Sequence, residues 1–298
     1  STNGWIPIED DTVTDAPINL NTEGIFAFGN DGSATAVSNL VSNAGVVATD
    51  VTGVGTARQS LAACEYGDDK GIFGFGSGYT AVTNLVSNAG VVATDTTGVG
   101  TARSFLAACS YGGDKGIFGF GYTGSATAVS NLVSNAGVVA TDTTGVGTAR
   151  QYIAACEYGG YKGIFGFGEG YTAVTNLVSN AGVVATDTTG VGTARQYPAA
   201  CSYGGDKGIF GFGYDGSNQS ITNLVSNAGV VATDTAGVGT ARRDIVACEY
   251  GGDKGIFGFG YTTGAVGMTN LVSNVGVVAS DVTAVGTART QPAACSFN

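Results

Sequence analysis

The stretch that decides the fold is ARSFLAACSYGGDKGIFGFG, residues 102–121, and near-copies of it recur along the chain. The tripeptide Thr-Ala-Arg marks each copy, and its arginines follow one another at intervals of 45, 47, 45, 47 and 47 residues. These arginines are Arg58, Arg103, Arg150, Arg195, Arg242 and Arg289. A cysteine follows each of them by six residues. A repeat of this length indicates one structural unit per copy, stacked against its neighbours.

Each unit contains four short segments typical of β-strands. In the unit that begins at Arg103 they are residues 105–111, 116–121, 128–133 and 138–142. The segments are rich in β-branched and aromatic residues, and turns containing Gly or Asn separate them. No segment keeps a helical period. The strands are apolar on both faces, which suits sheets that pack against other sheets.

Four strands in a unit of this length are typical of a propeller blade. The sequence therefore predicts an all-β, six-bladed β-propeller of four-stranded antiparallel blades over residues 22–298, preceded by an arm at 1–21. The two ends support ring closure. Residues 24–29 form a second strand with no first strand before it, and residues 293–297 form a first strand with no second after it. We expect these two strands to pair, which removes the open edges of the array.

The unit resembles a kelch repeat in three places. An arginine precedes a strand of small residues at 106–108, a Gly-Gly-Asp-Lys turn follows at 112–115, and an aromatic–glycine strand follows at 117–121. The resemblance covers all six units and implies a kelch-like propeller. It is a divergent one, because Gly-Phe-Gly replaces the usual Gly-Gly pair and the usual strand Trp is missing. The wording of the repeat is also similar to repeat arrays in fibre or appendage proteins of marine bacteriophages, which implies a virion or extracellular location.

The composition excludes several classes of function. The chain has no His, so His-based catalytic triads and His metal sites are excluded. A net charge of −11 with only 12 Lys and Arg disfavours nucleic acid, whose phosphates need clustered cations. No apolar run approaches the roughly 18 residues of a membrane helix. We expect no nucleic-acid partner and no membrane insertion.

The six cysteines occupy one register on six separate strands. Strands of neighbouring blades stand more than about 7 Å apart, which is too far for a disulfide. We interpret the cysteines as small buried apolar residues. Free thiols fit folding in a reducing cytoplasm.

The copies differ mainly in two zones. One is the loop between the second and third strands, and the other is the pair of residues after each arginine. In a four-stranded meander both zones lie at the same end of the blade, so they share one face of the disc. That face has eight aromatic residues, namely Tyr79, Tyr122, Tyr171, Tyr214, Tyr261, Phe105, Tyr152 and Tyr197. Rings suit sugar C–H faces, and Tyr is a favoured contact in protein interfaces. Neutral drift of exposed loops is the alternative.

The repeated arginines are expected near the axis, as a ring at the channel mouth. Their expected partners are the aspartates eight residues earlier, namely Asp50, Asp95, Asp142, Asp187, Asp234 and Asp281. One interpretation is an anion-binding ring. The favoured one is six structural pairs that fix the loop before the first strand.

Glutamate and serine alternate immediately after the cysteines. They are Glu65, Ser110, Glu157, Ser202, Glu249 and Ser296. Three carboxylates near the axis suit a hard cation. Pairing with Lys70, Lys162 and Lys254 is the alternative, and no metal site is predicted.

These observations favour a non-enzymatic recognition module on a virion fibre or another surface. One loop face would bind a glycan or a surface protein, and the arm would contact other subunits of an assembly. The alternative is a purely structural disc. A glycan hydrolase is a third hypothesis, because Asp215, Asp244 and Glu169 lie on the variable face. No catalytic residues and no cofactor are predicted.

Overall fold

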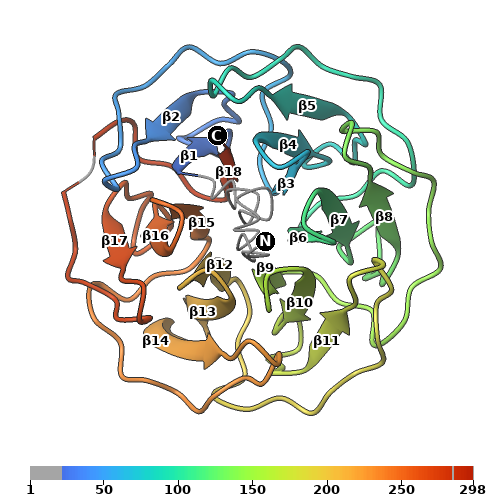
Figure 1. Ribbon diagram of the computed structural model, residues 1–298. Helices are drawn as coiled ribbons and strands as arrows, with labels where there is room; N and C mark the ends of the chain where they lie inside the picture. Colours follow the sequence, from blue (N-terminus) through green and yellow to red (C-terminus); the bar gives the residue numbers. More distant parts are fainter. Residues whose placement is uncertain (1–21, 284, 298) are drawn as a thin grey trace, which may run out of the picture.

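The computed structural model describes residues 22–283 and 285–297, and over this range eighteen β-strands form six three-stranded antiparallel sheets (Figure 1). The predicted arm at 1–21 lies outside the described residues. The strands are β1 Glu23–Ala27, β2 Ser38–Val41, β3 Ala62–Tyr66, β4 Lys70–Gly74, β5 Thr83–Val86, β6 Ala107–Tyr111, β7 Lys115–Gly119, β8 Ser130–Val133, β9 Ala154–Tyr158, β10 Lys162–Gly166, β11 Thr175–Val178, β12 Ala199–Tyr203, β13 Lys207–Tyr214, β14 Asn218–Val225, β15 Val246–Tyr250, β16 Lys254–Gly258, β17 Thr269–Val272 and β18 Ala293–Phe297. In this part of the chain no helix has the length and hydropathy needed to cross a bilayer.

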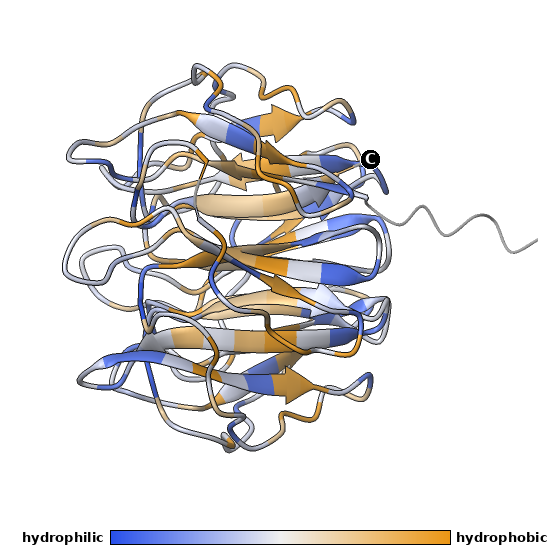
Figure 2. Cartoon of the chain, turned by 90° about the vertical axis from the view of Figure 1, so that its left-hand side faces the viewer, coloured by the Kyte–Doolittle hydropathy of each residue, from blue (hydrophilic) through white to orange (hydrophobic). Residues whose placement is uncertain are grey.

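The sheets are arranged as the blades of a propeller. In each one the first strand of the repeat lies nearest the axis, the second lies in the middle and the third lies outside (Figure 1). The inner strands of neighbouring blades contact one another around the whole ring. Seen from the side, the strands carry hydrophobic segments through the disc (Figure 2).

The predicted ring closure is confirmed. Strand β1 pairs antiparallel with β18, so that Glu23 lies opposite Phe297 and Ala27 lies opposite Ala293. The sheet β18-β1-β2 is thus built from both ends of the described chain.

The prediction of four strands per blade is wrong, because the fourth segment does not form a continuous ladder. In the blade of β6–β8 it meets β8 at two isolated bridges, Val133 to Val139 and Ser130 to Thr143. The register shifts by one residue between these bridges, as in a β-bulge. The side chain of Asn131 fills the gap, since its amide donates to Ala140 O at 3.0 Å. An outer edge of this irregular kind is a poor template for another strand.

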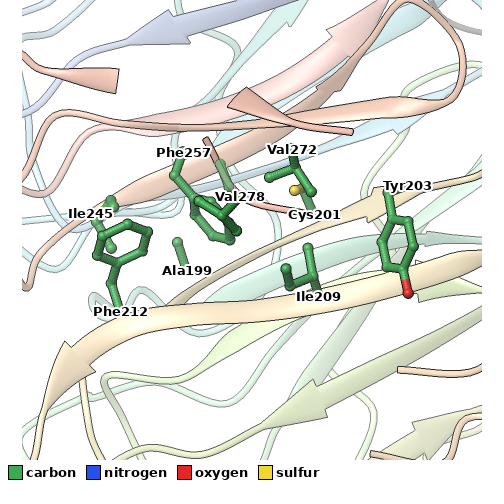
Figure 3. Packing of buried hydrophobic residues seen from close by; sticks show 10 residues of the cluster. Ala199, Cys201, Tyr203, Ile209, Phe212, Ile245, Phe257, Val272 and Val278 are labelled. Carbon is green, nitrogen blue, oxygen red and sulfur yellow. The ribbon is translucent and has the colours of Figure 1, made fainter. Parts of the chain in front are cut away.

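Glycines of the second strand allow neighbouring blades to approach closely. A Cβ added to Gly163 would lie 2.4 Å from Sγ of Cys109 in the preceding blade. A Cβ on Gly119 would lie 2.7 Å from the Phe165 ring of the following blade. Figure 3 shows one such interface, where Cys201 lies among Ile209, Val272 and other buried residues.

The cysteines are free and buried, in the role predicted for them. Burial raises the pKa of each of the six thiols, which makes the thiolate unfavourable. They therefore serve as packing groups between blades.

Candidate functional site

The inner strands enclose an axial channel of stacked cavities. Cavities of about 80, 110 and 60 Å³ follow one another and share lining residues. Their walls are rings with one residue from each blade. The mouth ring is Ser60, Phe105, Tyr152, Tyr197, Asp244 and Gln291. The collar is Leu61, Leu106, Ile153, Pro198, Ile245 and Pro292. The alanine ring is Ala63, Ala108, Ala155, Ala200, Ala247 and Ala294. The carboxyl ring is Glu65, Ser110, Glu157, Ser202, Glu249 and Ser296.

The mouth ring has the same unusual backbone in every blade. Its six residues all have φ between 51° and 58°, in the left-handed region that L-residues other than Asn and Asp rarely adopt. Backbone hydrogen bonds of 2.9–3.1 Å hold this conformation, because the N–H in one blade donates to the carbonyl of the mouth residue in the preceding blade. They join Phe105 to Ser60, Tyr152 to Phe105, Tyr197 to Tyr152, Gln291 to Asp244 and Ser60 to Gln291.

The side chains divide the mouth ring into two arcs. The aromatic arc has Phe105 and Tyr152 with ring centroids 4.7 Å apart, and Tyr152 and Tyr197 at 4.1 Å. In the polar arc Ser60 Oγ donates to Gln291 Oε1 at 2.7 Å, and Gln291 Nε2 donates to Asp244 Oδ1 at 3.0 Å. The mouth therefore offers ring faces on one side and hydrogen-bonding groups on the other.

Asp244 is the charged member of the polar arc. Its side chain is 11 % exposed, and Arg243 Nε lies 3.5 Å from its Oδ2. Burial raises the pKa of Asp244, although the contacts with Gln291 and Arg243 oppose the rise. The Arg243 guanidinium also lies over two rings, 4.7 Å from the centroid of Tyr214 and 4.9 Å from that of Tyr261.

The structure brings both variable zones to one end of the disc. The backbones of Ser104 and Tyr122, one from each zone, pair with each other as a bridge. Of the predicted aromatic residues, only Phe105, Tyr152 and Tyr197 line the described mouth cavity. The other five lie on loops outside it, where the ring centroids of Tyr79 and Tyr122 lie 6.1 Å apart in a tilted pair. Tyr171 and Tyr214 form a second pair at 6.3 Å, and Tyr261 lies under Arg243.

The arginine ring does not line the channel mouth, so that expectation is wrong. Each repeated arginine is at most 1 % exposed and lies between blades, with its guanidinium 4.1–4.5 Å from a Phe ring of the preceding blade. Arg103, for example, stacks on Phe75 and donates from Nε to Phe120 O at 2.8 Å. The Phe of Gly-Phe-Gly has a positive φ, 65° at Phe75, and this bend presents its ring to the arginine. These guanidinium groups therefore pack inside the protein and do not face the channel.

The predicted aspartate partners are also wrong. Arg58 pairs with Asp95 of its own blade, at 3.9 Å, and not with Asp50. Asp50 pairs instead with Arg289 across the ring closure, at 4.0 Å. Asp95 also accepts hydrogen bonds from the backbone and hydroxyl of Thr56, two residues before the arginine. Each aspartate thus fastens the incoming connection to the blade that it enters.

Ser60, Asp244 and Gln291 complete the mouth ring, and sequence reasoning did not name them as ligand-binding residues. The available signal was their position, two residues after each repeated arginine, in a zone that differs among the copies. Their aromatic counterparts were selected for ring chemistry alone.

Comparisons with known proteins identify the fold. No known protein family matches the chain, and no curated protein is similar to it in sequence. Among solved structures, a fungal alcohol oxidase of the AA5 family in complex with copper matches with a TM-score of 0.56 and 13 % identity. The match covers 91 % of this chain and 65 % of the oxidase. At this identity the likeness shows the propeller fold alone.

Proposed function

We propose that this chain is a divergent kelch-like propeller that acts as a non-enzymatic recognition module and binds a glycan at the mouth ring. The mouth ring is the observation that supports the proposal. One backbone geometry presents five different residue types at six equivalent positions. The repeats otherwise match closely, so the mouth ring is a position at which the side chains differ from blade to blade.

The two arcs suit the two sides of a sugar ring. Tyr152 and Tyr197 offer stacked, half-buried rings for its C–H face. Asp244 and Gln291 offer an acceptor and a donor–acceptor pair for its hydroxyls. Arg243 fixes the Asp244 carboxylate beside them. The resemblance of the repeat wording to phage appendage arrays is our ground for proposing display on a virion fibre or another outer surface.

A glycan array probed with the full chain tests this proposal. We expect a restricted set of glycans to bind, and Tyr197→Ala and Gln291→Ala each to weaken binding at least tenfold. Tyr161→Ala is the matched control, because Tyr161 is 62 % exposed on a turn at the opposite face. Unchanged binding by both mouth variants would remove the site from this face. If no glycan binds and a surface protein is captured through the same residues, the ligand is a surface protein and not a glycan.

A structural disc remains the second candidate because of an apolar ring on the opposite face. One valine in the turn after each third strand is 63–65 % exposed, and these residues are Val46, Val91, Val138, Val183, Val230 and Val277. The copy number of the chain in its native assembly separates the candidates. Low copy at a tip supports recognition, and high copy across a shell or filament supports the disc.

A further inference from the structure

The end of the channel away from the mouth ring is a second candidate site. Its cavity of about 60 Å³ is lined by the carboxyl ring and the alanine ring, and the alanine ring also lines the cavity of about 110 Å³ that leads to the collar. A water needs roughly 10–15 Å³ of such space. The two cavities therefore have room for several waters or for a short unbranched chain.

The carboxyl ring concentrates acidic groups at this end. Burial raises the pKa of Glu157 to about 8, and the nearby charge of Glu65 adds to the rise. Burial also raises the pKa of Glu249, with further contributions from Glu65 and Glu157. Lys254 does not offset the acidity near Glu249, because its Nζ donates to Asp253 Oδ1 at 2.5 Å. A cation that enters the cavity would favour the ionised form of both glutamates and would be stabilised by the carboxylates so formed.

The arrangement does not suit a metal ion. Among the described residues, no group of three or more Cys, Asp or Glu is placed to hold one. A buried hydroxyl points to a hydrogen-bond donor instead. Ser110 is 8 % exposed, lines the cavity, and has no side-chain hydrogen bond within the described chain. Its counterpart Ser296 differs, because its hydroxyl bonds Glu249 O at 3.0 Å.

We propose that this end of the channel binds a primary alkylammonium group on an unbranched aliphatic stem. The ammonium has three N–H donors, which Glu157, Glu249 and Ser110 would accept. The stem would lie along the alanine ring toward the collar, where methyl and methylene groups line the wall. Free alkylamines and the lysine side chain of another protein share this chemistry. The site is separate from the mouth ring and does not depend on the proposed function.

Calorimetry on the full chain with n-butylammonium tests the proposal, with 1-butanol and tetramethylammonium as controls for the stem and the charge. We expect n-butylammonium to bind at least tenfold more tightly than either control. Methylammonium should bind more weakly than n-butylammonium, because it buries less stem. Nα-acetyl-lysine amide distinguishes the sources, since its binding assigns the site to a lysine side chain and its exclusion assigns the site to free amines.

Variants complete the test. Glu157→Gln with Glu249→Gln should weaken n-butylammonium binding at least tenfold, and Glu169→Gln on the loop face should leave it unchanged. If the double variant fails to fold, Ser110→Ala serves instead, with a smaller loss of roughly threefold. Equal binding of 1-butanol and n-butylammonium, or full binding by the variants, would overturn the proposal.

Discussion

Arg150 and Tyr152 stand two residues apart, and their surroundings are opposite. Arg150 is enclosed, with its guanidinium over Phe120 of the preceding blade and hydrogen bonds to Phe167 O and Asn176 Oδ1 of its own. Tyr152 faces the channel mouth. The arginine recurs in all six copies, whereas the mouth residue changes almost every time.

The two positions differ in how freely the repeat can change at them. A change at an enclosed position must be matched by the neighbouring blade, whose own copy has the same contacts with the next. A change at the mouth meets solvent and leaves the backbone hydrogen bonds of the mouth ring in place. Each repeat therefore contains one fixed position, the buried arginine between blades, which we call the inter-blade wedge. It also contains one variable position, the residue of the mouth ring.

The largest expected effect breaks the wedge. Arg150→Met leaves Phe167 O, Asn176 Oδ1 and Thr148 O without their donor. Removing one partner from a buried charged network costs about 3–5 kcal/mol. Urea unfolding should show this loss, and Arg243→Met, at a partly exposed arginine, should cost less than half as much. Equal costs would mean that the wedge is no more important than a surface arginine.

The next effect concerns the carboxyl ring, whose glutamates are partly buried and line the channel. The pKa of Glu157 is about 8 in the folded chain against an ordinary 4.5, so folding favours the protonated acid. Its contribution to stability is complete below pH 4.5 and is lost as the pH rises to about 8. At 1.36 kcal/mol per pKa unit the ceiling is roughly 5 kcal/mol, reduced by water in the cavity.

Unfolding free energies measured between pH 4.5 and 8 test this expectation. Stability should fall across the range, and Glu157→Gln should flatten the fall whereas Glu169→Gln should not. A rise in stability over the same range would contradict the burial of these carboxyl groups. Below pH 4 a separate loss is expected. Burial acts to raise the pKa of Asp95, but hydrogen bonds from Thr56 and Asn84 outweigh it and lower the pKa.

A smaller effect tests the close approach of blades. Gly163→Ala places a Cβ against Cys109 Sγ, and overpacking of this kind costs about 1–3 kcal/mol. The double variant with Cys109→Ala removes that sulfur and should recover most of the loss. Chemical denaturation of both single variants and the double variant completes the cycle. Additive losses would show that the two residues do not meet.

The smallest effect on stability is expected at the mouth. Gln291→Ala removes two side-chain hydrogen bonds in a half-buried position, which together contribute about 1–2 kcal/mol. Glycan binding by the same variant should nevertheless fall at least tenfold. A stability loss as large as that of Arg150→Met would contradict the distinction between the mouth ring and the inter-blade wedge.

The repeat alone predicts much of this molecule. Its length and strand pattern predict the propeller, and the unpaired segments at 24–29 and 293–297 predict the closure through β1 and β18. Three features depend on geometry that cannot be read from the amino-acid sequence. The fourth strand fails because of a one-residue register shift that the Asn131 amide accommodates. The arginine side chains lie between blades, because the Phe of Gly-Phe-Gly adopts a positive φ and presents its ring to them.

The third feature is the polar arc of the mouth ring. Ser60 and Gln291 are 231 residues apart and become neighbours only when the ring closes. Sequence reasoning selected Phe105, Tyr152 and Tyr197 for their ring chemistry, together with five tyrosines that lie outside the mouth cavity. It named Asp244 only as a hydrolase candidate, and it missed Ser60 and Gln291, which meet across the closure.

The hydrogen bonds of the mouth ring have an electrostatic consequence. Each peptide unit has a dipole of about 3.5 D. In a helix these dipoles align and leave a field at each end. Here the N–H of one blade points along the ring to the carbonyl of the preceding one, so the dipoles follow one another around a circle and their sum largely cancels. The backbone therefore gives the mouth little polarity of its own. Whatever the mouth attracts or rejects is decided by the six side chains, which can change without disturbing the frame beneath them.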